Sequence, residues 1–103
     1  MNTERLVIDA RAIREFCDKH AIKTLSLFGS VLTDRFDANS DVDVMFESQG
    51  PSPGYFEQMA MTDELSSLFG RDVDLVSRRA VEQSTNRFRR EAILGGAQVI
   101  FAR

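Results

Sequence analysis

The feature that most restricts the fold of this chain is a pair of short segments in which aspartate alternates with apolar residues. Residues 41–47 read DVDVMFE and residues 71–77 read RDVDLVS. Alternation with a period of two is typical of β-strands whose two faces meet different surroundings. In each segment the apolar side chains would face a core, and the aspartates would point together to the opposite face. We therefore expect two strands that carry acidic residues on one face.

Helical and extended patterns alternate along the rest of the chain. Apolar residues at three-and-four spacing predict helices over 9–20, 55–69 and 79–94, and short apolar runs predict strands over 24–29 and 95–102. The expected buried side chains of the last two helices are Phe56, Met59, Leu65, Leu68 and Phe69, and Val81, Phe88, Ala92 and Ile93. This order of elements predicts an α/β or α+β fold, in which helices flank one mixed β-sheet.

The composition is that of one globular domain, which we take to span 1–103. A net charge of −3 does not favour direct binding of nucleic acid, because domains that grip the phosphate backbone usually carry a basic surface. Cys17 is the single cysteine, so an internal disulfide is impossible, which suits a reducing compartment. Nothing in the sequence reaches the roughly 18–20 apolar residues of a membrane span. We expect a cytoplasmic protein that does not bind membranes.

The acidic face offers a site for a divalent cation. Asp41 and Asp43 are two residues apart in one predicted strand, and Asp74 could join them if the second strand is a neighbour. Ionised carboxylates this close repel one another, and a cation between them offsets that repulsion. Mg²⁺ binds through carboxylate oxygens together with substrate phosphates. Three such carboxylates are sufficient for a two-metal site that promotes phosphoryl transfer.

A Gly-Ser pair follows the strand predicted over 24–29. Gly29 would let the backbone approach a ligand closely, because glycine has no side chain. Ser30 is the expected N-cap of a short helix or turn over 30–36, whose first N–H groups and hydroxyl could bind an anion. This loop could therefore hold phosphates beside a metal on the next strand.

Taken together, these segments resemble a known family. GSVLTDRFDANSDVDVMF (29–46), followed by LFGRDVDLVS (68–77), is similar to the minimal nucleotidyltransferases, the MNT branch of the polymerase-β-like superfamily, whose signature is GS-x10-D-x-D with a later third acid. The resemblance implies a polymerase-β-like nucleotidyltransferase fold. It also implies that Gly29 and Ser30 bind nucleotide phosphates, and that Asp41, Asp43 and Asp74 are catalytic and bind Mg²⁺.

Members of this length resemble the MntA-type antitoxins of HEPN–MNT toxin–antitoxin systems. This likeness implies a protein adenylyltransferase that transfers AMP from ATP to a tyrosine hydroxyl of a partner HEPN ribonuclease toxin and so neutralises it. The chain departs from the family where many relatives carry an Arg-Gly pair, since it has Thr33-Asp34 followed by Arg35.

Two other functions remain open on the sequence alone. The chain could neutralise a toxin by binding without catalysis, or it could transfer a nucleotide to a small molecule, although an added acceptor domain is not evident. A run of arginines is either a solvated helix face or a docking surface for an acidic partner or RNA. These residues are Arg78, Arg79, Arg87, Arg89 and Arg90.

Overall fold

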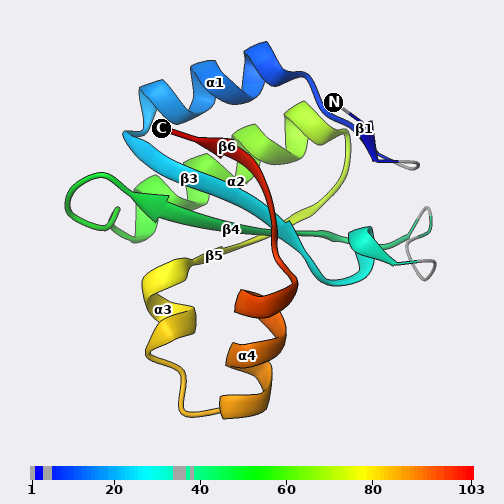
Figure 1. Ribbon diagram of the computed structural model, residues 1–103. Coiled ribbons are helices and arrows are strands. Elements are labelled where there is room, and N and C mark those ends of the chain that lie inside the picture. Colours follow the sequence, from blue (N-terminus) through cyan, green and yellow to red (C-terminus); the bar gives the residue numbers. More distant parts are fainter. Residues whose placement is uncertain (1, 4–5, 34–36, 38) are drawn as a thin grey trace.

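The computed structural model describes residues 2–3, 6–33, 37 and 39–103, and its centre is a four-stranded mixed sheet (Figure 1). Its strands are β3 (Ile22–Phe28), β4 (Val42–Ser48), β5 (Val73–Ser77) and β6 (Gln98–Ala102). The order across the sheet is β5-β4-β3-β6, with β4 parallel to β5 and β3 antiparallel to both of its neighbours. The predicted mixed sheet is therefore confirmed. A short antiparallel ribbon, β1 (Asn2–Thr3) and β2 (Leu6–Val7), precedes it.

Helices cover both faces of this sheet, as Figure 1 shows. One layer consists of α1 (Ala10–Lys19) and α2 (Tyr55–Phe69), and the opposite layer consists of α3 (Arg78–Glu82) and α4 (Arg87–Gly96). The segment predicted to be mostly helical over 79–94 is thus two helices. The break occurs where the side chain of Asn86 accepts a hydrogen bond from the Arg89 N–H and caps α4. No helix in the described ranges is both long and apolar enough to cross a bilayer.

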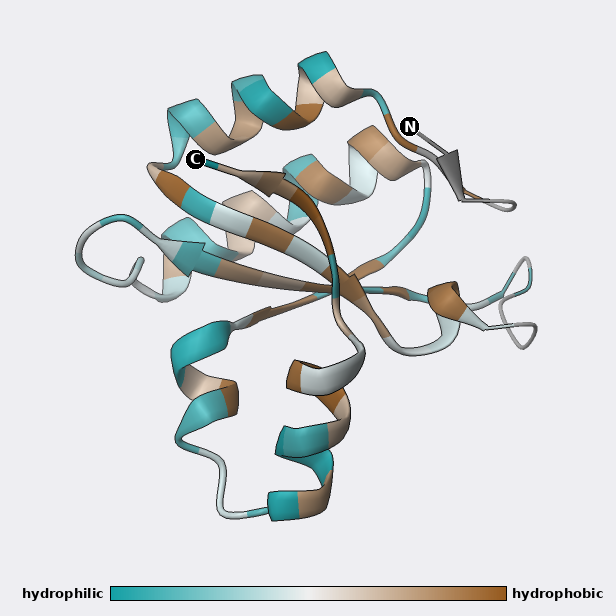
Figure 2. Ribbon diagram, in the orientation of Figure 1, coloured by the Kyte–Doolittle hydropathy of each residue, from teal (hydrophilic) through white to brown (hydrophobic). Residues whose placement is uncertain are grey.

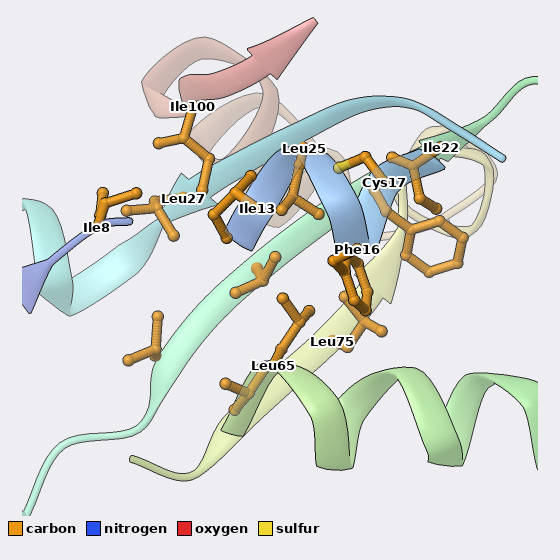
Figure 3. Packing of buried hydrophobic residues seen from close by; sticks show 14 of the residues in the cluster. Ile8, Ile13, Phe16, Cys17, Ile22, Leu25, Leu27, Leu65, Leu75 and Ile100 are labelled. Atoms are coloured by element: carbon orange, nitrogen blue, oxygen red, sulfur yellow. The ribbon is translucent and has the colours of Figure 1, made fainter. Parts of the chain in front are cut away.

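The strand alternation places the main core between the sheet and the α1–α2 layer. Val42, Val44 and Phe46 of β4 are buried there, and Leu75 of β5 lies beside them. Figure 3 shows how Leu25 and Leu27 of β3, with residues of α1 and α2, fill the same space. The aspartates of both alternating segments consequently lie on the other face.

Helix α1 follows its predicted apolar stripe. Ile13, Phe16 and Cys17 are buried, and the carboxylate of Asp9 caps the helix by accepting from the N–H groups of Arg11 and Ala12. Burial raises the pKa of the Cys17 thiol to about 12. The thiol therefore stays protonated and serves as a small apolar core group.

Helix α2 has the predicted bounds, and its predicted buried side is confirmed only in part, at Leu65 and at Phe69, which packs against the core. Met61 and Leu65 are buried, whereas Phe56 is 83% exposed and Met59 and Leu68 also face solvent. The stripe is narrow because α2 packs along the edge strand β5, where the side-chain amide of Gln58 donates to the Leu75 carbonyl. Figure 2 shows apolar residues at several places along α2, and the large exposed ones among them include Phe56, Met59 and Leu68.

A carboxylate on α2 joins the two helices of this layer. Glu64 accepts hydrogen bonds from Lys19 and from His20, the residue that ends α1. The hydrogen bond from Lys19 lowers the pKa of Glu64, with a smaller contribution from His20. The interaction therefore stabilises the native state only while Glu64 is ionised.

We expect Glu64→Gln to lower the free energy of unfolding at neutral pH by at most about 1 kcal/mol, because the group is partly solvent-screened. A lowered native pKa gives stability that is complete above the ordinary glutamate value and is lost as the pH falls through the lowered native value. Urea unfolding across acidic and neutral pH measures the difference. Asp63→Asn, an exposed neighbour on α2, is the control. A Glu64→Gln deficit that persisted in acid would contradict this account.

Candidate active site

Two of the predicted site residues lie side by side where β4 and β5 begin. Asp43 and Asp74 are direct partners in the parallel register of these strands, so their side chains share one face of the sheet. That face is the one toward α3 and α4, because Met45, two residues after Asp43, packs against Val81 and Ile93 of these helices. The register thus brings together two acids that are distant in sequence.

Asp41 directly precedes β4 and is exposed. Its position is fixed by contacts between the start of β4 and the start of β5. The Val42 N–H donates to the Asp72 carbonyl at 2.9 Å. The guanidinium of Arg71 donates to the carbonyl oxygens of Asp37, at 2.6 Å, and Ser40, at 3.1 Å. Sequence reasoning did not identify Arg71, because its contacts are to backbone atoms far away in the chain and leave no local pattern.

The charges of the three aspartates act on one another. Partial burial raises the pKa of Asp43, and the neighbouring carboxylates of Asp74 and Asp41 raise it further, while Arg89 on α4 opposes the rise. Repulsion of this kind is expected where carboxylates gather without a compensating cation. The structure therefore brings Asp41, Asp43 and Asp74 to one region, and their roles in catalysis and metal binding stay predictions.

Gly29 lies against the same carboxylate. It follows Phe28, the register partner of Asp43, and has a positive φ of 75°. A Cβ atom at this position would be only 2.3 Å from Oδ2 of Asp43. The glycine therefore leaves the space that the Asp43 carboxylate occupies, and it lets the chain turn immediately after β3.

The turn itself differs from the prediction in one detail. The 3₁₀ helix η1 (Gly29–Leu32) begins one residue earlier than expected, so Ser30 lies inside it and is not its N-cap. Phe28 occupies the cap position without a side-chain hydrogen bond, and the Ser30 carbonyl accepts from the Thr33 N–H and hydroxyl. Residues 34–36 of the predicted helix or turn, including Asp34 and Arg35, lie outside the described residues.

The donor set suits a hard divalent cation. Carboxylate oxygens are the ligands that Mg²⁺ prefers, and their mutual repulsion at Asp43 is what a bound cation would relieve. The carboxylates do not form a finished chelate: among the residues that the structure describes, no three His, Cys, Asp or Glu side chains are arranged to hold a metal ion as they stand. The residues fit the cation by chemistry and electrostatics.

The chain is similar in sequence to proteins with names that describe nucleotide transfer. Two proteins of Methanocaldococcus jannaschii, provisionally named protein adenylyltransferases, are 29% and 32% identical to the chain over 65 residues each. These matches span 62% and 63% of this chain and 65% of each relative, so the chain matches less than two thirds of their length.

Solved structures share the fold. A toxin–antitoxin structure with AMP-PNP superposes with a TM-score of 0.72 at 18% identity, over 93% of this chain and 75% of the other. An MNT antitoxin complex with a tri-AMPylated HEPN toxin of Shewanella oneidensis gives 0.63 at 18% identity, over 91% and 70%. A provisionally named minimal nucleotidyltransferase gives 0.67 at 26% identity, over 86% of each chain.

Among the sequence comparisons, the match to a family model covers more of the chain than the matches to the two relatives. The model of the nucleotidyltransferase domain matches residues 10–100, which include every element of the central sheet except the last two residues of β6. The chain therefore belongs to the nucleotidyltransferase domain family.

Proposed function

We propose that this chain is a single minimal nucleotidyltransferase domain that acts in the cytoplasm as a Mg²⁺-dependent protein adenylyltransferase. Its substrate is ATP, and its acceptor is a tyrosine hydroxyl of a HEPN ribonuclease toxin, which the transfer of AMP neutralises. The observation that carries this proposal is the side-by-side placement of Asp43 and Asp74, with Gly29 against the Asp43 carboxylate. A pair of carboxylates can hold the metal ion that neutralises the charge on nucleotide phosphates, and a backbone turn beside the pair can bind those phosphates.

In the proposed reaction, the tyrosine oxygen attacks the α-phosphorus of ATP. The new P–O bond forms as the bond from the α-phosphorus to the bridging oxygen breaks, and pyrophosphate leaves. Mg²⁺ held by Asp41, Asp43 and Asp74 would neutralise charge on the triphosphate and lower the pKa of the attacking hydroxyl. Asp74, which is exposed on β5, would accept the proton of that hydroxyl.

Gly29 and Ser30 are the proposed contacts to the phosphates. The turn at Gly29 brings the backbone close to the carboxylate of Asp43, so a phosphate bound there would lie near the acidic residues. Holding the reacting groups in position supplies much of the rate enhancement in phosphoryl transfer.

The nature of the acceptor is supported by the relatives. Two are named protein adenylyltransferases, and one structural neighbour is an antitoxin bound to an AMPylated HEPN toxin. A domain of 103 residues has little surface beyond its core and the site, so we expect the partner to supply the surface around the acceptor. Neutralisation by binding alone is the second candidate, since the carboxylates are not preassembled into a metal site.

The test is to mix the purified chain with labelled ATP, Mg²⁺ and a HEPN protein, taken from the neighbouring reading frame if that frame encodes one. We expect AMP on a tyrosine of the HEPN protein, seen as label and as a mass increase of one or more AMP units, and loss of its ribonuclease activity. Removal of Mg²⁺ with EDTA should prevent both. Inhibition of the ribonuclease without label would instead establish neutralisation by binding alone.

A further inference from the structure

Helix α4 carries an arginine on the side that faces the acidic residues. In Figure 1, α4 lies across the sheet from α1 and α2. Ile93 of α4 packs with Phe28 and Met45, which lie next to Gly29 and two residues after Asp43. Arg89 is four residues before Ile93, so the two side chains project from the same side of the helix.

A pocket next to this arginine opens on the same face of the sheet. Its volume is about 370 Å³, and it lies between α3, α4 and β5. Arg89 lines it together with Val76, which is two residues after Asp74 and shares its face of β5. The pocket therefore lies on the same face of the sheet as the acidic residues, although none of them lines it, and its cationic side chains are Arg89 and Arg90.

Three of the other four arginines on these two helices have partners in the described chain, whereas no side-chain partner is seen among the described residues for Arg79 of α3 or for Arg89. Arg78 pairs with Glu82 at 3.5 Å, and Arg87 pairs with Glu91 at 3.0 Å. Arg90 donates to the Ser84 carbonyl at 2.9 Å. The guanidinium of Arg89 makes no hydrogen bond or ion pair with the described residues. Its positive charge nevertheless interacts electrostatically with the Asp43 carboxylate.

A positively charged side chain beside the acidic residues would help to balance the negative charge of the proposed site. Three aspartates and a bound triphosphate are all anionic, and a cation that approaches from the side opposite to the strands would reduce their repulsion. A guanidinium suits phosphate, since its planar N–H groups can donate two parallel hydrogen bonds.

We propose that Arg89 is a substrate-positioning residue that binds the phosphate groups of the nucleotide where the α3–α4 pocket meets the acidic face. This inference rests on the proposed function, because it takes the nucleotide to be bound at Asp41, Asp43 and Asp74. It assigns to α4 a cationic contact in addition to the proposed contacts of the Gly29-Ser30 turn.

The experiment measures the affinity of the full chain for ATP with Mg²⁺, without any partner protein, by isothermal titration. Arg89→Ala is expected to weaken binding by about tenfold or more, as expected for loss of charge-assisted hydrogen bonds. Arg89→Lys should recover part of the affinity, because it keeps the charge without the planar geometry. Arg87→Ala is the matched control on the first turn of α4, outside the pocket lining, and should bind like the unchanged protein.

Thermal unfolding without nucleotide separates this role from a structural one. Arg89 is exposed and makes no hydrogen bond with the described residues, so Arg89→Ala should shift the midpoint only slightly, through its long-range interaction with Asp43, while the affinity falls. Equal affinity in Arg89→Ala and the unchanged protein, or an equal loss in Arg87→Ala, would overturn the inference and leave the proposed function intact. If the unchanged chain binds ATP but never labels its partner, the proposed function fails and the role of Arg89 in binding is still decided by these affinities. Absence of any ATP binding would overturn both.

Discussion

Replacement of Asp43 by asparagine should abolish AMP transfer and, in the metal-free protein, raise the stability of the fold. The loss of activity should exceed about 100-fold, because even residues that merely support a metal ligand typically contribute 10–100-fold. Asp43 is the most central of the three acids, since it contacts the Gly29 turn and is the register partner of Asp74. AMP labelling of the partner protein measures the loss.

The gain in stability follows from the raised pKa of Asp43. Burial and the neighbouring Asp74 and Asp41 disfavour its ionised form in the native state. For a carboxyl group with a raised native pKa, the destabilisation is complete above that raised value and disappears below the ordinary aspartate value. In EDTA, Asp43→Asn should therefore unfold at a higher temperature than the unchanged protein at neutral pH, and the difference should shrink in acid.

Asp63→Asn on α2 provides the control for this pair of measurements. It removes an equal charge from an exposed position remote from the acidic residues, and it should change neither transfer nor the midpoint appreciably. If Asp43→Asn transferred AMP at the normal rate, the assignment of the site would be wrong. If it were less stable than the unchanged protein in EDTA, the three carboxylates would not be in electrostatic conflict.

Gly29→Ala is expected to impair both folding and catalysis. An alanine at φ +75° is strained, which costs about 1–3 kcal/mol. Its Cβ would also meet Oδ2 of Asp43 at 2.3 Å, so the carboxylate would have to move. A displacement of about 1 Å at a reacting centre can cost on the order of 100-fold in rate. Urea unfolding and AMP labelling measure the two effects.

Gly70→Ala separates these two effects. Gly70 ends α2 with a positive φ of 67°, but no atom of the described residues, apart from its immediate chain neighbours, lies within 4 Å of the position that its Cβ would take. This variant should show the backbone strain without a displaced carboxylate, so it should lose stability and keep its activity. If both glycine variants lost activity to the same degree, the close approach to Asp43 would not be the cause.

The strands and their acidic face were predictable because the signal is local. The alternation around Asp43 and Asp74 determines which side chains face the core, and the two strands proved to be neighbours. The sequence left open whether the two strands are neighbours, and their parallel pairing was not predicted, because no residue within either strand indicates which strand it pairs with.

The buried sides of the helices were harder to predict. The apolar stripe of α1 was correct because it is unambiguous, but α2 has large apolar residues on several sides. Met61 and Leu65 are buried there, whereas Phe56 is exposed, and Phe88 on α4 is also 84% exposed. Which side of such a helix is buried depends on how it docks on the sheet, and that is decided by tertiary contacts.

The contacts made by Arg71 and Arg89 were beyond sequence reasoning for a related reason. Arg71 donates to carbonyl groups more than thirty residues earlier in the chain. Arg89 stood only as one member of an arginine-rich segment, and its relation to Asp43 depends on how α4 packs under the sheet. Neither role follows from the identity of adjacent residues.

The position of β5 at the border of the sheet has a thermodynamic consequence. It is paired on one side only, to β4, and it carries Asp74, while β4 carries Asp43. A nucleotide that engages both carboxylates binds only the conformations in which this outermost strand is attached. If ATP is the nucleotide, as proposed, mass action would make detachment of β5 rarer as the concentration of ATP rises, so that the supply of nucleotide would also stabilise the domain.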